Sequence, residues 1–540
     1  MKNEAITRDL SSMSRAELEQ NIVELTTEVE SQKEKIRWLQ EQFNLLQQKR
    51  FGVSSEKGMS DGEQMSLFNE AEWTVDEAGE DIPEPDLSKV APPRKKKTKG
   101  GKDRMVSGLP KEVLEFRLTD DERICSVCGS ELTEVRKTIR KELIVIPAQV
   151  KVREYHDAVY TCRNCHKNGI ENPMYTGGAP KPLLRNTLAS PSFVADIIRR
   201  KFVEGVPLYR QESEFKRRGI RLSRQTMSSW MIRCSEKYLQ GIYDFLKENL
   251  LKRDIIQADE TTVQVLHEPD KPATSESYMW LYRTSPWDTG SQIILYEYQD
   301  NRRQENPVNF LGDFHGYLQT DGYSGYNALR KREKNPVTSV GCWAHAKRFF
   351  CDALKALPKG DKERPHTNTD TAIAYCDKIF AIDRENNLAD LTPEERTRIR
   401  EEQTLPVLDA YFEWVNSFDT DHLIKGKFRD GIVYSQKQEA ALRAFALDGR
   451  LQCSNNAAER SIKPFVICRK NFLFCNTPSG AGSTATAFSI VETAKANNLD
   501  PYKYLKYIFE KLSQDDDYDL EQLMPWSEDV KESCSASVTE

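Results

Sequence analysis

The spacing of hydrophobic and polar residues changes along this chain, and each spacing predicts a different kind of element. Residues 18–46 keep a strict heptad in which two apolar positions alternate at intervals of three and four residues. The apolar members are Leu18, Ile22, Leu25, Val29, Ile36, Leu39, Phe43 and Leu46, and the polar Gln32 stands among them. This pattern is typical of a left-handed coiled coil and predicts a homodimer or higher oligomer formed through residues 14–50. One long amphipathic helix packed against its own protein is the alternative.

A helical spacing returns in residues 183–236, where turns separate three short segments. A Ser-Pro pair precedes the first segment, and Ser223 precedes the third, so both are placed as N-caps. Such helices predict a helix-turn-helix, with an ordinary helical bundle as the alternative. As far as residue 235 this stretch holds eleven Lys or Arg against four Asp or Glu. The start of the third helix is therefore expected to contact DNA, through Arg224, Gln225 and Thr226.

From residue 250 the apolar residues follow the spacing of β-strands. Three strand-like segments, a short helix and then two strand–turn–helix units follow one another. The order β-β-β-α-β-α-β-α is that of a ribonuclease-H-like sheet, in which the first and fourth strands are neighbours. Residues 353–445 are again helical in pattern, with a capping box at Thr392 and Glu395, and predict an insertion into the catalytic fold. Trp414 in this insertion either packs in its core or stacks on an unpaired base.

Composition narrows the class of protein. The chain has 540 residues and a net charge of −6, lacks any apolar run long enough to span a membrane, and begins without a signal-like segment. These features favour a multidomain, soluble, cytoplasmic protein without a membrane partner. The negative net charge alone argues weakly against nucleic-acid binding, but the charge is unevenly distributed. An acidic stretch and the basic run "PPRKKKTKGGKDR" lie side by side in residues 58–112, which predict a disordered linker or an arm that binds phosphates.

Four of the twelve cysteines have regular spacing. They form two C-x2-C pairs on either side of a segment that is expected to be a β-hairpin, with "KELIVI" and "VKVREYHDAVY" as its strands. Four thiolates so arranged predict one structural zinc ion in a zinc ribbon, rather than disulfides or a chance pattern. The expected ligands are Cys125, Cys128, Cys162 and Cys165.

Carboxylates occupy the positions where a ribonuclease-H-like sheet places its metal ligands. Asp259 lies on the first strand and Asp321 follows the fourth, so the two should lie close together. Glu459 stands in "SNNAAERSIKP", which begins like a helix capped by Ser454 or Asn455 and is followed by the apolar, strand-like "NFLFCN". That helix either has a solvated, charged face or directs Glu459 at the metal. Its cations would then face phosphate, and they are Arg460, Lys463, Arg469 and Lys470.

The motifs "ADET", "TDGYSGY", "NNAAERSIKP" and "RKNFLF" resemble those of the insertion-sequence-66 family of bacterial DDE transposases. The resemblance extends from about residue 14 to residue 512 and departs from the family at Gln32, Ser461 and Lys463. It implies a metal-binding triad of Asp259, Asp321 and Glu459. It also implies that DNA is the partner, both as the element's ends, which carry inverted repeats, and as the target. The resemblance further implies association with the nucleoid and small companion proteins of the element.

Strand transfer is a phosphoryl transfer, and its chemistry suits these residue types. Two Mg²⁺ ions about 3.5–4 Å apart activate the attacking oxygen and neutralise the leaving one, and carboxylates are their preferred ligands, with Mn²⁺ as a substitute. Glu260 is the rival of Asp259, but neighbours on a strand point to opposite faces, and the resemblance selects Asp259. His345 either touches phosphate or has a structural role. A DNA-binding regulator with an inactive catalytic fold, and a nuclease without strand transfer, are the alternative functions.

The chain is therefore expected to be a multidomain α+β protein. Its expected parts are a coiled coil (14–50), a disordered linker (58–112), a zinc ribbon (113–170), a helix-turn-helix (183–236), a ribonuclease-H-like catalytic domain in two parts (250–352 and 446–513) around a helical insertion (353–445), and a disordered tail (514–540).

Overall fold

The computed structural model describes most of the chain beyond residue 148 and single helical positions between residues 26 and 43. The described ranges are 149–161, 174–176, 178–288, 290–356, 367–386 and 390–536. They fall into two compact units. The larger unit contains a five-stranded sheet with its helices, and the smaller contains a two-stranded hairpin.

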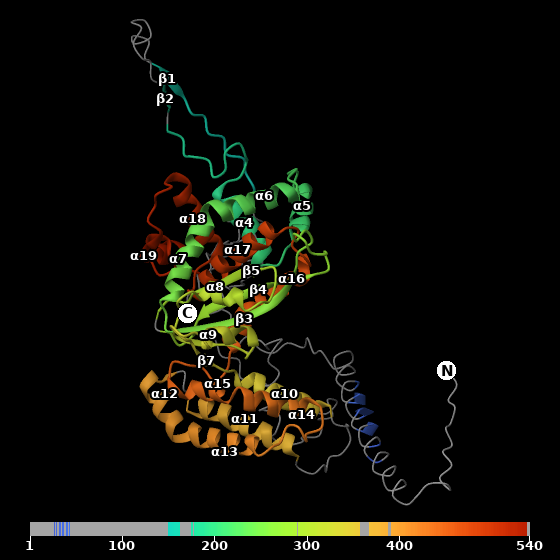
Figure 1. Ribbon diagram of the computed structural model, residues 1–540. Helices are drawn as coiled ribbons and strands as arrows, with labels where there is room; N and C mark the ends of the chain where they lie inside the picture. Colours follow the sequence, from blue (N-terminus) through green and yellow to red (C-terminus); the bar gives the residue numbers. More distant parts are fainter. Residues whose placement is uncertain are drawn as a thin grey trace, which may run out of the picture. The chain divides into compact units, whose positions relative to one another are not determined.

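A mixed sheet forms the centre of the larger unit (Figure 1). Its strands are β3 (Ile255–Gln264), β4 (Glu276–Thr284), β5 (Ile294–Gln299), β6 (Tyr317–Gln319) and β7 (Thr338–Val340). The central strand β3 pairs antiparallel with β4 and parallel with β6, and the spatial order is β5-β4-β3-β6-β7. The prediction that the first and fourth strands of this sheet are neighbours is confirmed.

Different helices cover the two faces of the sheet. On one face, α7 (Gln240–Leu251) and α8 (Glu305–Leu311) pack together, and Phe310 of α8 stacks on Tyr282 of β4 with ring centroids 3.8 Å apart. On the other face lies α16 (Asn456–Phe472), which receives hydrogen bonds from Arg283 of β4. Because Tyr282 and Arg283 are consecutive, they identify the two faces of β4.

The outer strand β5 is bordered by α17 (Pro478–Ala496). The backbone N–H of Ile294 donates to the Thr493 hydroxyl at 3.0 Å, and that of Tyr296 donates to the Ser489 hydroxyl at 2.7 Å. These side-chain acceptors satisfy donors that an open sheet edge would expose.

The three helices predicted in residues 183–236 are present as α4 (Pro191–Phe202), α5 (Leu208–Arg217) and α6 (Arg224–Cys234). The Ser190 hydroxyl accepts a hydrogen bond from the backbone of Phe193, and the Ser223 hydroxyl accepts one from Thr226, so both predicted N-caps are confirmed. The apolar side chains of these helices belong to the same core as the sheet and the helices α17 and α18 (Pro501–Gln514).

The prediction of a disordered tail from residue 514 is wrong for residues up to 536. A 3₁₀ turn (Leu520–Leu523) and α19 (Glu528–Cys534) follow α18. The side chains of Leu523, Met524, Val530 and Cys534 are buried in the main core. These few apolar residues suffice to order a segment whose overall composition is acidic, because they share one core with α18.

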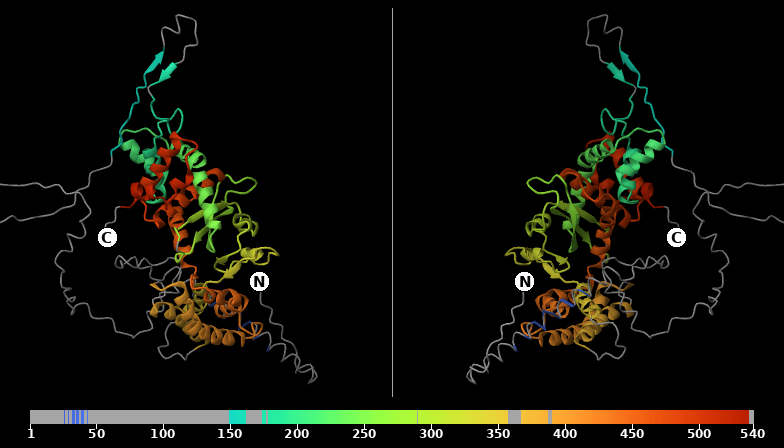
Figure 2. Two further views of the ribbon diagram at one scale, coloured as in Figure 1. Left: turned by 90° about the vertical axis from the view of Figure 1, so that its left-hand side faces the viewer. Right: turned by 90° about the vertical axis from the view of Figure 1, so that its right-hand side faces the viewer.

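The described residues between 343 and 447 form a helical part around a second hydrophobic core, to which Ile255 of β3 and Val340 of β7 also belong. Figure 2 shows its helices as a yellow-to-orange layer in both views. The helices are α10 (Trp343–Lys355), α11 (Asn368–Glu385), α12 (Pro393–Ile399), α13 (Leu405–Asn416), α14 (Lys427–Lys437) and α15 (Glu439–Ala444). The capping box of Thr392 and Glu395 is confirmed, and a π-helical turn (Arg400–Thr404) joins α12 to α13. Trp414 packs with Phe418 at a centroid distance of 5.0 Å, in agreement with a role in this core.

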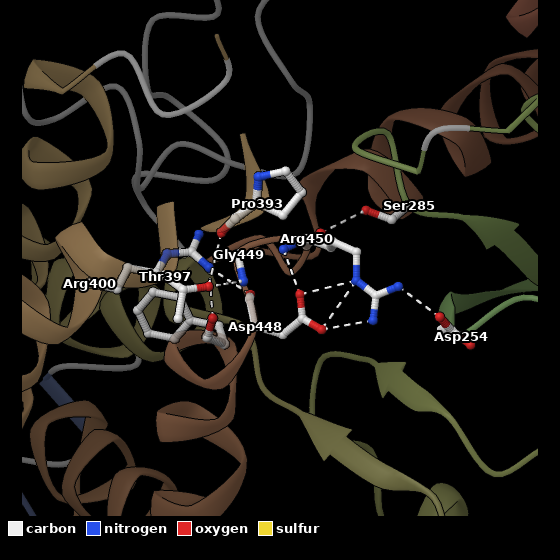
Figure 3. Close-up of polar contacts among 9 residues, drawn as sticks. Asp254, Ser285, Pro393, Thr397, Arg400, Asp448, Gly449 and Arg450 are labelled. Carbon is white, nitrogen blue, oxygen red and sulfur yellow. Dashed lines mark hydrogen bonds and ion pairs between the residues drawn. The ribbon is translucent and has the colours of Figure 1, made fainter. Parts of the chain in front are cut away.

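The chain returns from the helical part to the sheet through a segment that polar contacts hold in place (Figure 3). The Arg450 guanidinium contacts Asp448 at 2.8 Å and also Asp254, the residue before β3, at 2.7 Å. Gly449 lies so close to Pro393 that a Cβ here would be 1.9 Å from the Pro393 carbonyl oxygen, which excludes any side chain. The segment that leads into α16 is thus connected directly to the start of the central strand.

The smaller unit contains an antiparallel pair, β1 (Val159–Thr161) and β2 (Met174–Thr176). The expected strand "VKVREYHDAVY" is present only at its end, since residues 150–158 form no strand in the described part of this unit, and "KELIVI" lies outside the described residues. The second C-x2-C pair lies between β1 and β2 in sequence and outside the described residues. Of the heptad region, Val29, Ile36, Leu39 and Phe43 are helical and exposed. No described helix is both long enough and apolar enough to cross a membrane.

Candidate catalytic site

The three carboxylates named from the sequence come from three separate elements. Asp259 lies in the middle of β3, Asp321 follows β6 by two residues, and Glu459 lies in the first turn of α16. The structure brings them together at the centre of the sheet. Burial raises the pKa of Asp259 well above its usual range, and the negative charges of Glu260, Asp321 and Glu459 raise it further. Neighbouring negative charges raise the pKa of a carboxyl because they disfavour its ionised form.

Asp259 and Glu260 lie on opposite faces of the sheet. Asp259 shares the face of Arg283, which is covered by α16 and therefore by Glu459. Glu260 lies opposite Trp280 on the other face, where it forms an ion pair with Arg302 and accepts a hydrogen bond from the Tyr326 hydroxyl at 2.8 Å. Glu260 therefore has two partners of its own in the protein, whereas Asp259 accepts only the backbone N–H of Glu260 among the described hydrogen bonds.

The start of α16 is fixed to β3 by Asn455. The sequence suggested this side chain, or that of Ser454, as a helix cap, but Asn455 makes no side-chain capping bond. Its side-chain amide instead donates to the Ala258 carbonyl at 2.9 Å, and the residue is completely buried. Glu459 is also buried, at 4% exposure, so the interpretation of this helix face as a solvated charged surface is wrong. The polar face is directed into the protein, at the strand that carries Asp259.

Helix α10 supplies two further side chains that contact Glu459. Nη2 of Arg348 lies 3.5 Å from Oε2 of Glu459, and Nδ1 of His345 lies 3.4 Å from Oε1. The Nη1 group of Arg348 also lies 3.1 Å from Nε2 of His345. Arginine only donates hydrogen bonds, so Nε2 must be the acceptor, and the neutral ring then carries its hydrogen on Nδ1, facing Glu459. Burial and the Arg348 charge lower the pKa of His345 to about 4, which keeps the ring neutral near pH 7.

Sequence reasoning named His345 but missed Arg348, which is three residues further along the same helix. Residues three apart lie on one helix face, so the pair His345 and Arg348 carried a signal that spacing alone could have shown. Arg302 and Tyr326, the partners of Glu260, were also missed, because they lie 42 and 66 residues from it and only the fold brings them near.

Cys342, His345 and Glu459 offer another set of ligand atoms, which all lie within 4.8 Å of one another. The Cys342 sulfur already accepts the backbone N–H of Asn455 at 3.2 Å, and burial together with the Glu459 charge raises its pKa to about 12. A protonated thiol and an N–H group do not ligate a cation. In the arrangement described, Glu459 is therefore the member of this set that is suited to a metal, and the other two side chains surround it.

The four cations predicted to face phosphate lie along α16. Arg460 and Lys470 are exposed, Lys463 is partly buried, and Arg469 donates to the hydroxyls of Thr261 and Thr262 on β3 at 3.3 and 3.1 Å. The segment "NFLFCN" is not a strand as expected. The helix continues through Phe472, and only Cys475 forms an isolated bridge, with Val265.

Of the residues predicted to contact bases, Arg224 and Gln225 are exposed at the first turn of α6, and Thr226 is partly buried beside Ser223. The four cysteines predicted to bind zinc lie outside the described residues. The remaining eight cysteines are buried free thiols.

Comparison with protein families gives four matches along the chain. The model described as "Transposase IS66 family" matches residues 186–483, and the "IS66 C-terminal element" matches residues 489–526. The "zinc-finger binding domain of transposase IS66" matches residues 122–166, and "Transposase C of IS166 homeodomain" matches residues 38–113.

Relatives that match most of this chain occur in Sinorhizobium fredii. The uncharacterized protein y4qI is 27% identical over 512 residues, which cover 92% of this chain and 90% of the relative. The uncharacterized protein y4jD is 27% identical over 435 residues, which cover 78% and 82%.

Proposed function

The chain belongs to the IS66 family of transposases, and from this we propose that it cleaves the ends of an insertion sequence and transfers them to target DNA. The observation that carries the proposal is the position of Asp259, Asp321 and Glu459. These three carboxylates come from distant parts of the chain, and the pKa of Asp259 is raised by burial and, together with Glu260, by the charges of the other two. The strand order supports a ribonuclease-H-like catalytic domain, and the helical part is its insertion.

The donor set fits hard divalent cations. Carboxylate oxygens are the ligands that Mg²⁺ prefers, and the repulsion felt by Asp259 would be relieved by positive charge. Asp259, Asp321 and Glu459 would hold two Mg²⁺ ions, for which Mn²⁺ can substitute. When bound, these ions supply activation of the attacking oxygen and neutralisation of the leaving one.

The remaining side chains of the site act on the carboxylates and on DNA. His345 and Arg348 hold Glu459 from the side of α10, and Asn455 fixes its helix against β3. Arg460, Lys463, Arg469 and Lys470 provide positive charge for the phosphate backbone. Arg224, Gln225 and Thr226 at the start of α6 would read the terminal inverted repeats, as the second helix of a helix-turn-helix does.

The N-terminal parts would organise two DNA ends. A structural zinc ion held by Cys125, Cys128, Cys162 and Cys165 would fix the ribbon, and four thiolates leave no open position for catalysis. The exposed heptad residues Val29, Ile36, Leu39 and Phe43 are suited to pair with a second copy of the chain. Small companion proteins of the element remain proposed partners.

The function is tested with the DNA that flanks the reading frame. Duplexes carrying the flanking inverted repeats are incubated with the full chain, Mg²⁺ and a supercoiled target plasmid. The proposal predicts cleavage at the repeat end and joined products, both absent with Glu459→Gln, which keeps the size of the side chain but removes its charge. Binding of the repeats without cleavage by the wild-type chain would favour a DNA-binding regulator, and cleavage without joining would favour a simple nuclease.

A further inference from the structure

Helix α16 ends in an unusual backbone conformation at Leu473. This residue has φ +67° and ψ −49°, and the N–H of Phe474 donates to the carbonyl of Phe472 at 2.8 Å. The two features define a γ-turn of positive φ, which is rare and strained for a residue with a branched side chain. Glycine adopts this conformation at little cost, yet the chain has leucine here.

The side chains displayed by this turn are apolar and exposed. Leu473 is 64% exposed and Phe474 is 42% exposed, and Ile467 on the preceding part of α16 is 44% exposed. We call Leu473 and Phe474 the apolar tip. Backbone hydrogen bonds on both sides of the turn hold this conformation within the protein. Among the described residues the apolar tip has little packing, so the turn presents two apolar side chains to the solvent.

The apolar tip is held rigidly relative to the proposed catalytic site. On one side Leu473 N–H donates to the Arg469 carbonyl at 2.7 Å, and on the other Cys475 N–H donates to the carbonyl of Gln264, the last residue of β3, at 2.9 Å. The tip thus joins the end of the helix that carries Glu459 to the end of the strand that carries Asp259.

The distance from the carboxylates to the apolar tip is similar along α16, from Glu459, and along β3, from Asp259. Fourteen helical residues from Glu459 to Leu473 rise about 20 Å, and the five strand residues from Asp259 to Gln264 span about 17 Å. This range corresponds to about five or six base-pair steps of B-DNA.

The surroundings of the apolar tip favour DNA over an apolar protein surface. From Glu459 to Phe474 the chain carries four cations and one acid, and Lys470, three residues before Leu473, is exposed and forms no ion pair with a described residue. Cations beside exposed leucine and phenylalanine are the combination with which proteins bind phosphates and insert side chains between bases.

We propose that the apolar tip inserts against the base stack of bound DNA, about five or six base pairs from the phosphate at the proposed catalytic site, and stabilises an unstacked base step there. The inference rests on the proposed function, since it requires that DNA lie along α16. The ligand is a nucleobase in a distorted duplex, and the side chains of Leu473 and Phe474 contact it.

The test compares two duplexes of about 30 base pairs that are identical except for one central mismatch, which lowers the cost of unstacking. The mismatched duplex carries the fluorescent base 2-aminopurine at its mismatch, and the other duplex carries it at the same position. The fluorescence of this base reports unstacking. The wild-type chain should bind the mismatched duplex about tenfold more tightly and increase its fluorescence. Leu473→Gly and Phe474→Ala should bind both duplexes equally, with little change in fluorescence. Leu447→Ala is the control, because Leu447 is 65% exposed but lies in the helical part.

Thermal unfolding separates this role from a structural one. Leu473→Gly removes the strain, so its unfolding midpoint should equal or exceed that of the wild type while the mismatch preference is lost. If Leu473→Gly and Phe474→Ala both keep the preference and the fluorescence increase, the inference is wrong while the proposed function stands. If the wild-type chain binds neither duplex, the inference is wrong, and the cleavage assay with the flanking repeats decides separately on the proposed function. Asp259→Asn should keep the preference, because it changes the chemistry and not the apolar tip.

Discussion

The side-chain amide of Asn455 donates a hydrogen bond to the backbone carbonyl of Ala258 at 2.9 Å. Strand β6 pairs with β3 only as far as Gln257, so Asn455 binds the first carbonyl beyond this pairing. Asp259 is the next residue of the strand, and Glu459 lies one helical turn after Asn455. This buried hydrogen bond therefore links the segments that carry two proposed metal ligands, which are 200 residues apart in sequence.

Asn455→Ala should reduce both stability and activity. Loss of the buried bond is expected to cost about 1–3 kcal/mol of unfolding free energy, and displacement of Glu459 should lower the cleavage rate about 10–100-fold. Thermal unfolding and a DNA-cleavage assay measure the two effects. Asn497→Ala is the matched control, since Asn497 donates a comparable bond to the Gln292 carbonyl at 2.7 Å. It should lose stability but keep its rate; an equal loss of rate in both variants would show that Asn455 acts only through stability.

His345 should act on Glu459 through the hydrogen on Nδ1. His345→Ala is expected to lower the cleavage rate about 10–100-fold and to raise the Mg²⁺ concentration needed for half-maximal activity, because Glu459 loses a partner that orients it. His345→Asn places an amide N–H near the position of Nδ1 and should recover part of both losses. The measurement is a Mg²⁺ titration of cleavage for the three proteins. An unchanged half-maximal Mg²⁺ concentration in His345→Ala would contradict an orienting role.

Most strands and helices could be predicted because period-2 and helical patterns are local properties of the sequence, and the order of these elements indicated the neighbouring strands. Alternation along the strand placed Asp259 and Glu260 on opposite faces, and the family resemblance selected Asp259 for the proposed triad. Residues 514–535 were misjudged because an average acidic composition conceals the four apolar side chains, Leu523, Met524, Val530 and Cys534, that enter the core.

Contacts between distant segments could not be predicted in this way. Asn455 has the sequence context of a helix cap, and only the end of β6 makes the Ala258 carbonyl available to it. The turn at Leu473 is equally hidden, because an apolar run such as "NFLFCN" carries the pattern of a strand and its positive φ is set by the backbone pairing with β3.

Glu297 of β5 should make stability depend on pH. Its Oε2 atom is buried without a hydrogen-bond partner in the part of the chain that the structure describes, and burial raises its pKa to about 7 from a usual value of 4.5. When the pKa of an acid is higher in the folded protein than in the unfolded chain, its contribution to stability is fully present below the pKa of the unfolded chain. This contribution is lost as the pH rises through the pKa of the folded protein. The loss between about pH 4.5 and pH 7 amounts to about 3 kcal/mol.

Glu297→Gln mimics the protonated acid and removes this titration. The variant should match the wild type in thermal unfolding near pH 4.5, and it should be the more stable protein above about pH 7. A constant difference between the two proteins across this range would show that Glu297 is solvated.

Zinc should be bound by the full-length chain in a ratio of about one ion per chain, since the expected ligand set is one group of four cysteines. Cys125→Ser should lose the ion, as measured by elemental analysis after dialysis. Cys376→Ser is the control, because Cys376 is buried in the helical part and belongs to neither C-x2-C pair. Retention of zinc by Cys125→Ser would remove this cysteine from the ligand set.

Asp259, and not its neighbour Glu260, is the proposed member of the catalytic triad on β3. The most direct measurement is Mg²⁺-dependent cleavage of the element's end by Asp259→Asn and Glu260→Gln, side by side, with DNA binding measured for both. Glutamine at 260 can still contact Arg302 and Tyr326, so this variant should fold and keep measurable cleavage. Asp259→Asn should bind DNA but lose more than about 100-fold in rate, since even outer-shell changes at metal sites cost 10–100-fold. An active Asp259→Asn beside an inactive, folded Glu260→Gln would contradict the assignment.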